Sequence, residues 1–451
     1  MANKKKSNSS NKYQKKAVKT ATKMAKKNPK AFFIILLVLV LAVGIGLAVY
    51  FLFLKDKIGP QGGSSSEPTT SQTISSSSEP LSSETISSSE ERSSSEPVSS
   101  SEEYSSSEPV SSSEEHSSSH AHAEYNPKLE TPSGMSINFL ELGCYNTGDS
   151  TYIKAGDVDI LIDAGSIQSS AGTIKEFVNK YCEDGKLEYV IATHAHKDHI
   201  AGFVGTSKIS GIFDSYKIGT LIDFALTNSD TTLYNNHVTK RDAALARGDM
   251  EHHYTAAQCV AETGGAKKEY TINDYVKMTI LDQRFYHETT SDENDYSVCA
   301  LFTHNNQNHY LFTGDLEKDG EASLVALNEL PHVQLFKGGH HGSKTSNTDT
   351  LLSKITPENV CICCCAGNDE YTKNVDNQFP TQTAINNIAK YTSYIYVTTV
   401  TTDGHTGYTS MNGNICFKSE NGKDYTIAGS NNSVILKDTE WFKTNRTWPT
   451  V

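Results

Sequence analysis

The sequence predicts an α/β fold for residues 126–451, because short apolar strands alternate there with amphipathic helices. This alternation is typical of domains in which helices cover the sheets. Two further observations mark where that domain begins. An uncharged apolar run is followed by a long Ser- and Glu-rich run, and neither has the composition of a folded domain. We therefore divide the chain into four parts, residues 1–30, 31–54, 55–125 and 126–451.

The first two parts predict a membrane anchor. Residues 1–30 form a basic tail with 11 Lys and no acidic residue, and residues 31–54 read AFFIILLVLVLAVGIGLAVYFLFL. As a helix these 24 residues span about 36 Å, enough to cross a hydrocarbon core of about 30 Å. The alternative, a cleaved secretory signal, has a shorter apolar region that ends in small residues. We expect a transmembrane helix. Because Lys-rich flanks stay on the cytoplasmic side, the N-terminus would be cytoplasmic and the C-terminal domain extracellular, which is a single-pass cell-membrane topology.

Residues 55–125 are expected to form a disordered stalk. The twelve-residue sequence SSSEPVSSSEEY at 93–104 is repeated almost unchanged at 105–116, and residues 61–123 contain 28 Ser and 11 Glu. Such a segment has almost nothing to bury, and its carboxylates repel one another. The alternative is a metal-binding tract formed by His116, His120 and His122.

The elements of the C-terminal domain follow in order. Alternating apolar residues predict a strand at 158–162, and apolar residues at i, i+3, i+4 and i+7 predict a helix at 174–181. A strand at 187–194 follows, and then an irregular insert around 203–270. The second half is expected to contain strands at 308–315, 360–365 and 394–400 and helices at 348–355 and 382–391.

Nine cysteines raise the question of disulfides. Four of them are crowded into VCICCCAG, namely Cys361, Cys363, Cys364 and Cys365. This spacing does not fit paired zinc knuckles, so we expect small buried residues of a strand, with a disulfide or a metal site as the alternatives.

The segment Thr193-His194-Ala195-His196-Lys197-Asp198-His199 follows a predicted strand directly. Side chains two apart in an extended backbone share a face, so His194 and His196 can bind one cation. Asp198 and His199 lie where the chain turns and can reach a second cation. Imidazole nitrogens with a carboxylate oxygen suit zinc, with manganese and iron as alternatives. The other interpretation is a polar loop that is rich in His by chance.

This segment resembles the HxHxDH signature of the metallo-β-lactamase-fold hydrolases. Asp163 in LIDAG, Asp315 in LFTGD and FKGGHHGSKTS at 336–346 match further motifs of that family in the expected order. The His-His-Gly-Ser form, together with NDYS at 294–297 and Gly148-Asp149-Ser150, is similar to the hydrolase domain of ComEC-type DNA-uptake proteins and to phosphorylcholine esterases. The resemblance implies an αββα sandwich.

The resemblance also implies a site with two divalent metal ions. The first ion would bind His194, His196 and a bridging Asp315. The second would bind Asp198, His199, Asp315 and His341. Two catalytic roles are implied, a proton shuttle at Asp198 and a substrate-facing electrophile or proton donor at His340. Supporting roles around the ligands fall to Asp163, which orients the metal loop, and to Asn294 and Ser297.

Two departures from the family pattern affect the site. Many members supply a third His to the first metal from the region between the HxHxDH segment and the bridging Asp. In this chain that region offers Asn294, Asp295 and Ser297 instead. His287, His304 and His309 are nearby, but none of them lies in a recognisable motif. A Gly-His-Pro of relatives appears here as Gln378-Phe379-Pro380. We expect a more open first metal and a difference in substrate choice.

These features together predict an extracellular, membrane-anchored dinuclear metallohydrolase. We expect a phosphodiesterase or related ester hydrolase that uses a metal-bound hydroxide on a small-molecule or cell-surface substrate. One alternative is a ComEC-like DNA nuclease, and another is a non-catalytic surface binding module. The net charge of −13 disfavours nucleic acid, which is normally bound by clustered Lys and Arg. The fold also supports lactone, thioester and β-lactam cleavage.

Overall fold

The computed structural model describes residues 123–145 and 147–450. The predicted basic tail, the predicted span at 31–54 and all but the last three residues of the predicted stalk lie outside the described residues. The alternative metal tract at His116, His120 and His122 lies outside them as well.

The localisation predicted from the sequence has to be corrected. Within the described part of the chain, no helix has both the length and the apolar character needed to cross a bilayer. The prediction depended on residues 31–54, which are not among those described. The single-pass topology with an extracellular C-terminal domain is therefore withdrawn.

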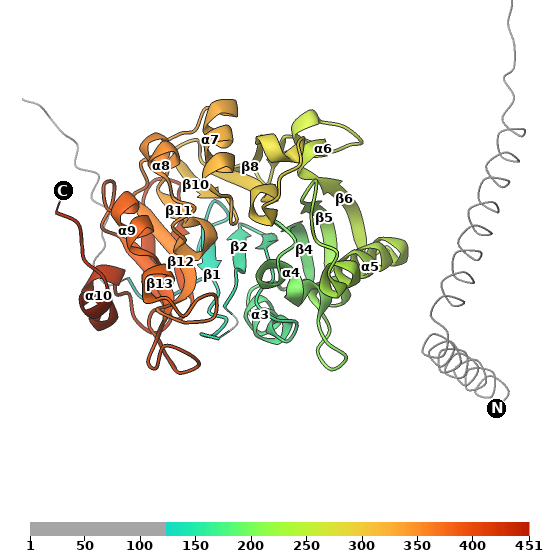
Figure 1. Ribbon diagram of the computed structural model, residues 1–451. Helices are drawn as coiled ribbons and strands as arrows, with labels where there is room; N and C mark the ends of the chain where they lie inside the picture. The colour runs from blue at the N-terminus through green and yellow to red at the C-terminus, as the bar shows by residue number, and fades with distance from the viewer. Residues whose placement is uncertain (1–122, 146, 451) are drawn as a thin grey trace, which may run out of the picture. The chain divides into compact units, whose positions relative to one another are not determined.

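Two eight-stranded sheets form the centre of the domain (Figure 1). The first consists, in spatial order, of β16 (Thr426–Gly429), β15 (Ile415–Ser419), β1 (Met135–Phe139), β2 (Thr151–Ala155), β3 (Val158–Ile162), β4 (Lys186–Ile191), β5 (Lys217–Asp223) and β6 (Met250–Thr255). The second consists of β14 (Tyr408–Ser410), β13 (Ile395–Thr401), β12 (Asn359–Ala366), β11 (Leu335–Lys337), β10 (Asn308–Phe312), β9 (Cys299–His304), β8 (Val276–Leu281) and β7 (Glu269–Thr271). Strands β3 to β6 are parallel, as are β10 to β13.

Helices cover the outer faces of both sheets (Figure 1). Those beside the first sheet are α3 (Ser170–Val178), α4 (Lys197–Val204), α5 (Thr232–Arg247) and α6 (Ala256–Ala261). Those beside the second sheet are α7 (Lys318–Leu327), α8 (Asp349–Ile355) and α9 (Gln382–Ile388), and α10 (Glu440–Asn445) lies near the C-terminus.

The burial pattern of strand β10 shows how the layers pack. Tyr310 and Phe312 belong to the core between the two sheets, whereas Leu311 belongs to the core shared with α7, α8 and α9. Successive side chains of a strand point to opposite faces, so a strand covered on both sides must be apolar throughout. The layer order helix–sheet–sheet–helix confirms the predicted sandwich.

The region 203–270 corrects the predicted irregular insert. It contains β5, the sixteen-residue helix α5 and β6, which extend the first sheet. Helix α5 begins after Thr231, whose hydroxyl accepts a hydrogen bond from the backbone N–H of Tyr234, and ends at Gly248 with a φ of 71°. Only His237 and Ala244 of this helix are buried, so the sequence carries almost no apolar periodicity there.

The cysteine-rich strand is buried throughout, as predicted, and one of its four cysteines forms a disulfide. Cys361, Cys363 and Cys364 are buried free thiols in β12, but Cys365 forms a disulfide with Cys144. The partner lies 221 residues earlier in the chain, so nothing local in VCICCCAG indicates the bond.

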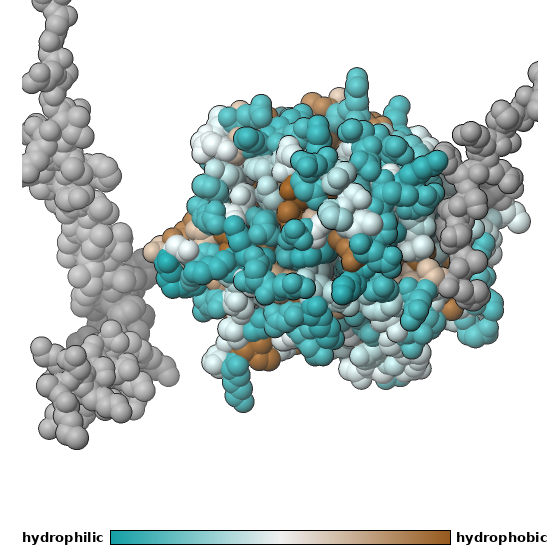
Figure 2. All heavy atoms as spheres, turned by 180° about the vertical axis from the view of Figure 1, so that it is seen from behind, coloured by the Kyte–Doolittle hydropathy of each residue, from teal (hydrophilic) through white to brown (hydrophobic). Residues whose placement is uncertain are grey.

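The face seen in Figure 2 is mainly hydrophilic. Apolar side chains occur on it as small separate spots among the described residues, which is ordinary for a protein surface.

Candidate metal centre

Four segments that follow parallel strands converge at one end of the sandwich. Asp163 follows β3, the HAHKDH segment follows β4, Asp315 follows β10, and the His340–His341 pair follows β11. The carboxyl ends of parallel strands meet at the same edge of a sheet, which brings side chains from distant parts of the chain together.

Asp315 lies at the centre of this convergence. Its Oδ2 is 3.1 Å from His199 Nε2, 3.3 Å from His341 Nε2 and 4.0 Å from His340 Nε2. Two sets of side chains that consist only of expected metal ligands each have all their donor atoms within 4.8 Å of one another: His194, His199 and Asp315 form one set, and Asp198, His199 and His341 form the other. The second set contains three of the four ligands expected for the second ion.

His196 is placed differently from the other histidines of its motif. It is the N-cap residue of α4, and its Nδ1 lies 3.0 Å from Nε2 of His194. Among the described residues it belongs to neither of the two sets, and its contact with the centre is the one with His194.

In four histidines of the site, an oxygen atom of another residue contacts the Nδ1 atom and orients the ring. The Nδ1 atoms of His199 and His341 lie 2.8 Å from Asp163 Oδ2 and from the carbonyl oxygen of Cys363. His194 Nδ1 lies 3.3 Å from Ser297 Oγ, and His340 Nδ1 lies 3.2 Å from Glu317 Oε1. At His199 and His341, the carboxylate and the carbonyl oxygen hold the proton on Nδ1 and turn Nε2 toward the centre, where it can bind a cation.

Asp163 and Ser297 also hold the backbone of the site. Asp163 accepts hydrogen bonds of 2.8 Å from both the backbone N–H and the hydroxyl of Thr193, directly before the His motif. The hydroxyl of Ser297 accepts a 3.0 Å bond from the N–H of Asp315. Asn294 stands one step further away, with its amide donating to Glu317.

The two residues of the His pair occupy different positions. Both have left-handed backbone conformations, with φ of 46° at His340 and 50° at His341, which is uncommon for residues other than Gly. His341 is buried, and its Nε2 lies 3.4 Å from Asp198 Oδ2 in addition to its contact with Asp315. The side chain of His340 is 19% exposed and stands at the edge of the site.

Burial and charge act in opposite directions on these groups. Burial alone would raise the pKa of Asp315, but positive charge on His199, His341 and Lys337 outweighs it and holds the pKa well below its usual range. Burial and the neighbouring His199 lower the pKa of His194, so its imidazole is neutral. For His199 burial lowers the pKa, and the charges of Asp315 and Asp163 raise it further than burial lowers it.

The residues present fit divalent cations. Nε2 of His341 is buried and makes no hydrogen bond within the described residues, although two carboxylate oxygens lie within 3.4 Å of it. Imidazole nitrogens that surround shared carboxylate oxygens form a donor set typical of zinc and related metals, which bind the imidazole in its neutral form. A cation at this point would satisfy the open nitrogen and screen the carboxylates from one another.

Comparison with known proteins agrees with this geometry. Residues 146–211, which include the HAHKDH segment, match the family model of the metallo-β-lactamase superfamily. The chain has the metallo-β-lactamase fold. It is similar to Recombination protein 2 of Haemophilus influenzae, with 34% identity over 73 residues, and to ComE operon protein 3 of Bacillus subtilis, with 25% identity over 183 residues.

These similarities cover small parts of the proteins. The matched segments are 16% and 39% of this chain but only 9% and 20% of the two relatives. Among solved structures, the metallo-β-lactamase fold protein YhfI of Bacillus subtilis matches with a TM-score of 0.35 and 12% identity, over 60% of this chain and 98% of that one. A diphosphatase of the PhnP family matches with a TM-score of 0.31 and 16% identity, over 50% and 85%.

The candidate metal centre contains a buried ion pair that the sequence analysis did not single out. The ammonium of Lys337 contacts Asp149 Oδ2 and lies 3.5 Å from Asp315 Oδ1, and both side chains are almost fully buried. Asp149 Oδ1 in turn lies 3.4 Å from His341 Nδ1. The sequence did contain a signal for this pair, because Lys337 lies in an otherwise apolar strand just before Gly338. A charged side chain buried in such a strand requires a partner of opposite charge.

Glu293 is a second residue that the sequence did not indicate. Its Oε1 accepts hydrogen bonds from the N–H of Ala195, between the two first histidines, and from the hydroxyl of Thr227, and its Oε2 accepts one from the N–H of Asn228. It thereby joins the metal loop to the loop after β5. In sequence it is one of several acidic residues in SDENDY, and nothing distinguishes it from a solvated loop residue.

The three histidines that could have supplied a third nitrogen have other partners. Nε2 of His304 lies 2.7 Å from the carbonyl oxygen of Ser133, and Nε2 of His287 lies 2.9 Å from Asp282. His309 Nδ1 lies 3.2 Å from Thr303 Oγ1. Each of these three histidines therefore has a partner outside the candidate centre.

Glu321 holds the segment that follows the His pair in place through hydrogen bonds. It is buried in α7, and its carboxylate accepts hydrogen bonds from the N–H groups of Asn347 and Thr348 at 2.7 and 2.8 Å. Asn347 then exchanges two 2.9 Å hydrogen bonds with the backbone of Gly339, next to the His pair. Burial raises the pKa of Glu321 from 4.5 to about 7, although its hydrogen bonds lower it.

We expect Glu321 to make stability depend on pH. A carboxyl group whose pKa is raised in the folded protein stabilises the fold fully below its unfolded pKa, and this contribution is lost as the pH rises through about 7. The free energy of unfolding of the wild type relative to Glu321→Gln should therefore fall by about 3 kcal/mol between pH 4 and 8. Urea unfolding at several pH values measures this difference. The exposed Glu329→Gln is the control, and parallel pH profiles for wild type and Glu321→Gln would contradict the prediction.

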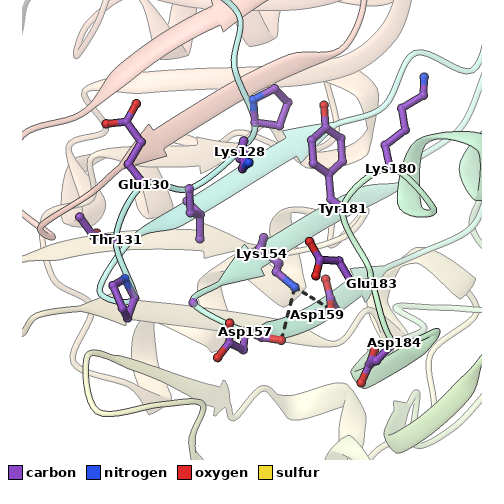
Figure 3. Close-up of a pocket in the computed structure, with 14 residues that line it drawn as sticks. Lys128, Glu130, Thr131, Lys154, Asp157, Asp159, Lys180, Tyr181, Glu183 and Asp184 are labelled. Atoms are coloured by element: carbon purple, nitrogen blue, oxygen red, sulfur yellow. Dashed lines mark hydrogen bonds and ion pairs between the residues drawn. The ribbon is translucent and has the colours of Figure 1, made fainter.

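A separate cavity lies beside the turn that joins β2 to β3 (Figure 3), whereas Asp163 of the metal centre follows the opposite end of β3. Its volume is about 570 Å³, and it is lined by residues 127–132, the β2–β3 turn and the segment after α3. The buried Asp159 in its wall is already bonded to Lys154 at 2.8 Å and to the hydroxyl of Tyr152. No histidine lines this cavity, so it does not contribute to the candidate centre.

Proposed function

We propose that the protein is a metal-dependent phosphodiesterase or related ester hydrolase with two divalent cations. The observation that carries this proposal is the arrangement around Asp315 Oδ2, where the Nε2 atoms of His199 and His341 lie at 3.1 and 3.3 Å. Asp315 also lies with His194 and His199 in a set whose donor atoms are all within 4.8 Å of one another, so its carboxylate stands between a proposed ligand of the first ion and proposed ligands of the second and is suited to serve both.

The proposed ligands are those that the sequence motif implied. His194, His196 and Asp315 would hold the first ion, and Asp198, His199, Asp315 and His341 would hold the second. The burial of His341 and its contacts with two carboxylates support a ligand role for it over His340. For His196, the support is its 3.0 Å contact with His194.

Two cations bound there would polarise the oxygens of a phosphodiester and lower the pKa of water near them. Around them the side chains of the chain orient the substrate and move protons. His340 lies at the open edge of the site, where Glu317 Oε1 lies 3.2 Å from its Nδ1 and orients the ring toward the substrate as an electrophile or proton donor. Asp198 Oδ2 lies 2.6 Å from the hydroxyl of Tyr371, which fixes this carboxylate at the same edge.

A DNA nuclease remains the second candidate. The observation in its favour is the similarity to ComE operon protein 3 and Recombination protein 2. The negative charge of the chain weighs against it, because nucleic-acid binding draws on clustered positive charge.

A hydrolysis panel tests the proposed function. The full chain, supplied with zinc or manganese, should hydrolyse bis-p-nitrophenyl phosphate and lose this activity on chelation. p-Nitrophenyl phosphorylcholine, single-stranded DNA and a lactone complete the panel. Cleavage of DNA in preference to small diesters would favour the nuclease, and lactone cleavage alone would favour a carboxylic ester hydrolase. A metal-loaded protein inactive on all four would contradict the proposal and favour a binding module.

A further inference from the structure

Two aromatic side chains from one loop lie beside the His pair. The loop connects β12 to α9 and carries Tyr371 and Phe379. The Phe379 ring centroid is 5.7 Å from that of His340 and 6.0 Å from that of His341. Tyr371 lies 5.2 Å from Phe379, and its ring is within 16° of parallel to His341 at 6.0 Å.

The two rings differ in what they contribute. Tyr371 is 47% exposed, so its ring faces solvent at the edge of the metal centre, and its hydroxyl is held on Asp198. Phe379 is partly buried behind it and packs on the second core. Together they place an apolar aromatic surface next to a site otherwise formed by carboxylates and imidazoles.

The loop is fixed at both ends, which makes this surface preorganised. At the start, Cys365 is joined to Cys144, and Glu370 Oε2 accepts a 2.9 Å hydrogen bond from the N–H of Thr147. At the end, the guanidinium of Arg446 donates to the carbonyl oxygens of Gln378 and Pro380 at 2.8 and 3.1 Å. A surface held in place before binding loses little entropy when a ligand stacks on it.

On the basis of the proposed phosphodiesterase function, we propose that Tyr371 and Phe379 form an aromatic wall that determines substrate specificity. The wall selects diesters in which an uncharged, planar aromatic group is attached to the phosphoryl centre. Aromatic rings stack in offset or edge-to-face geometry at centroid distances that the existing pairs already show. The carboxylates of Asp198 and Glu317 at the same edge disfavour an anionic group in this position.

Two substrates with the same leaving group isolate this effect. Phenyl 4-nitrophenyl phosphate and methyl 4-nitrophenyl phosphate both release 4-nitrophenolate and differ only in the spectator group. The full-length wild type should prefer the phenyl diester in kcat/KM by about tenfold, the selectivity expected from one to two aromatic contacts. Phe379→Leu and Tyr371→Leu, which keep an apolar side chain but remove the ring, should each reduce the ratio of the two kcat/KM values several-fold.

Matched controls and a binding measurement complete the test. Tyr371→Phe keeps the ring and loses the hydroxyl, so its phenyl-to-methyl ratio should equal that of the wild type. Inhibition by phenylphosphonate and by methylphosphonate should show the same preference, and the same loss in the two Leu variants. If both diesters are hydrolysed with a ratio near one, or with a ratio that the Leu variants leave unchanged, the wall is refuted while the phosphodiesterase function stands. If neither diester is hydrolysed and neither phosphonate binds, the proposed function fails and the wall fails with it.

Discussion

Asp315→Asn should remove most of the activity and most of the bound metal. Asn has the same size as Asp but no negative charge, so the central oxygen near His199 and His341 would lose its attraction for cations. Loss of a residue that only supports a metal ligand costs about 10–100-fold in affinity or activity, and a shared ligand should cost more. We expect a fall in kcat/KM of at least about 10³, with metal content measured on the same samples.

A matched variant separates this effect from a general loss of charge. Asp319 lies four residues further along the chain and is exposed at the start of α7. Asp319→Asn should keep both metal content and activity. If Asp315→Asn retained two ions and wild-type rates, Asp315 would not be a shared ligand and the arrangement of the centre would have to be revised.

His341→Ala and His340→Ala should fail in different ways. His341 is buried between Asp198 and Asp315, so its removal should lower metal content and activity together. His340 stands at the open edge with its Nδ1 on Glu317, so its removal should leave the metal content unchanged and lower kcat by about 10²–10³. Elemental analysis and steady-state kinetics on both variants distinguish the two roles.

The reverse pattern would exchange the roles of the pair. If His340→Ala lost metal while His341→Ala kept its full metal content, His340 would be the ligand. The location of the metal centre would still stand. Full metal content and full rates in both variants would show that the pair takes no part in the chemistry.

The strands next to the site could be predicted because their signals are local. The predicted strand at 158–162 matches β3 residue for residue, and the predicted helix at 348–355 matches α8 to within one residue. Helix α5 could not be predicted, because only two of its sixteen residues are buried. Its position is set by packing against β6 and α4, and a weak apolar pattern does not carry that information.

By itself, the sequence determined which residue types face the candidate centre and in what order they arrive. The motif with His194, His196, Asp198 and His199 follows β4, and Asp163 and Asp315 follow β3 and β10. Only the tertiary structure decided which histidine of the 340–341 pair is buried between carboxylates. It also decided that Lys337 pairs with Asp149 and that Glu293 reaches Ala195 across 98 positions of the chain. The physical reason is that side-chain partners of this kind arise where two sheets and their loops pack together, so they depend on distances in space that no local spacing encodes.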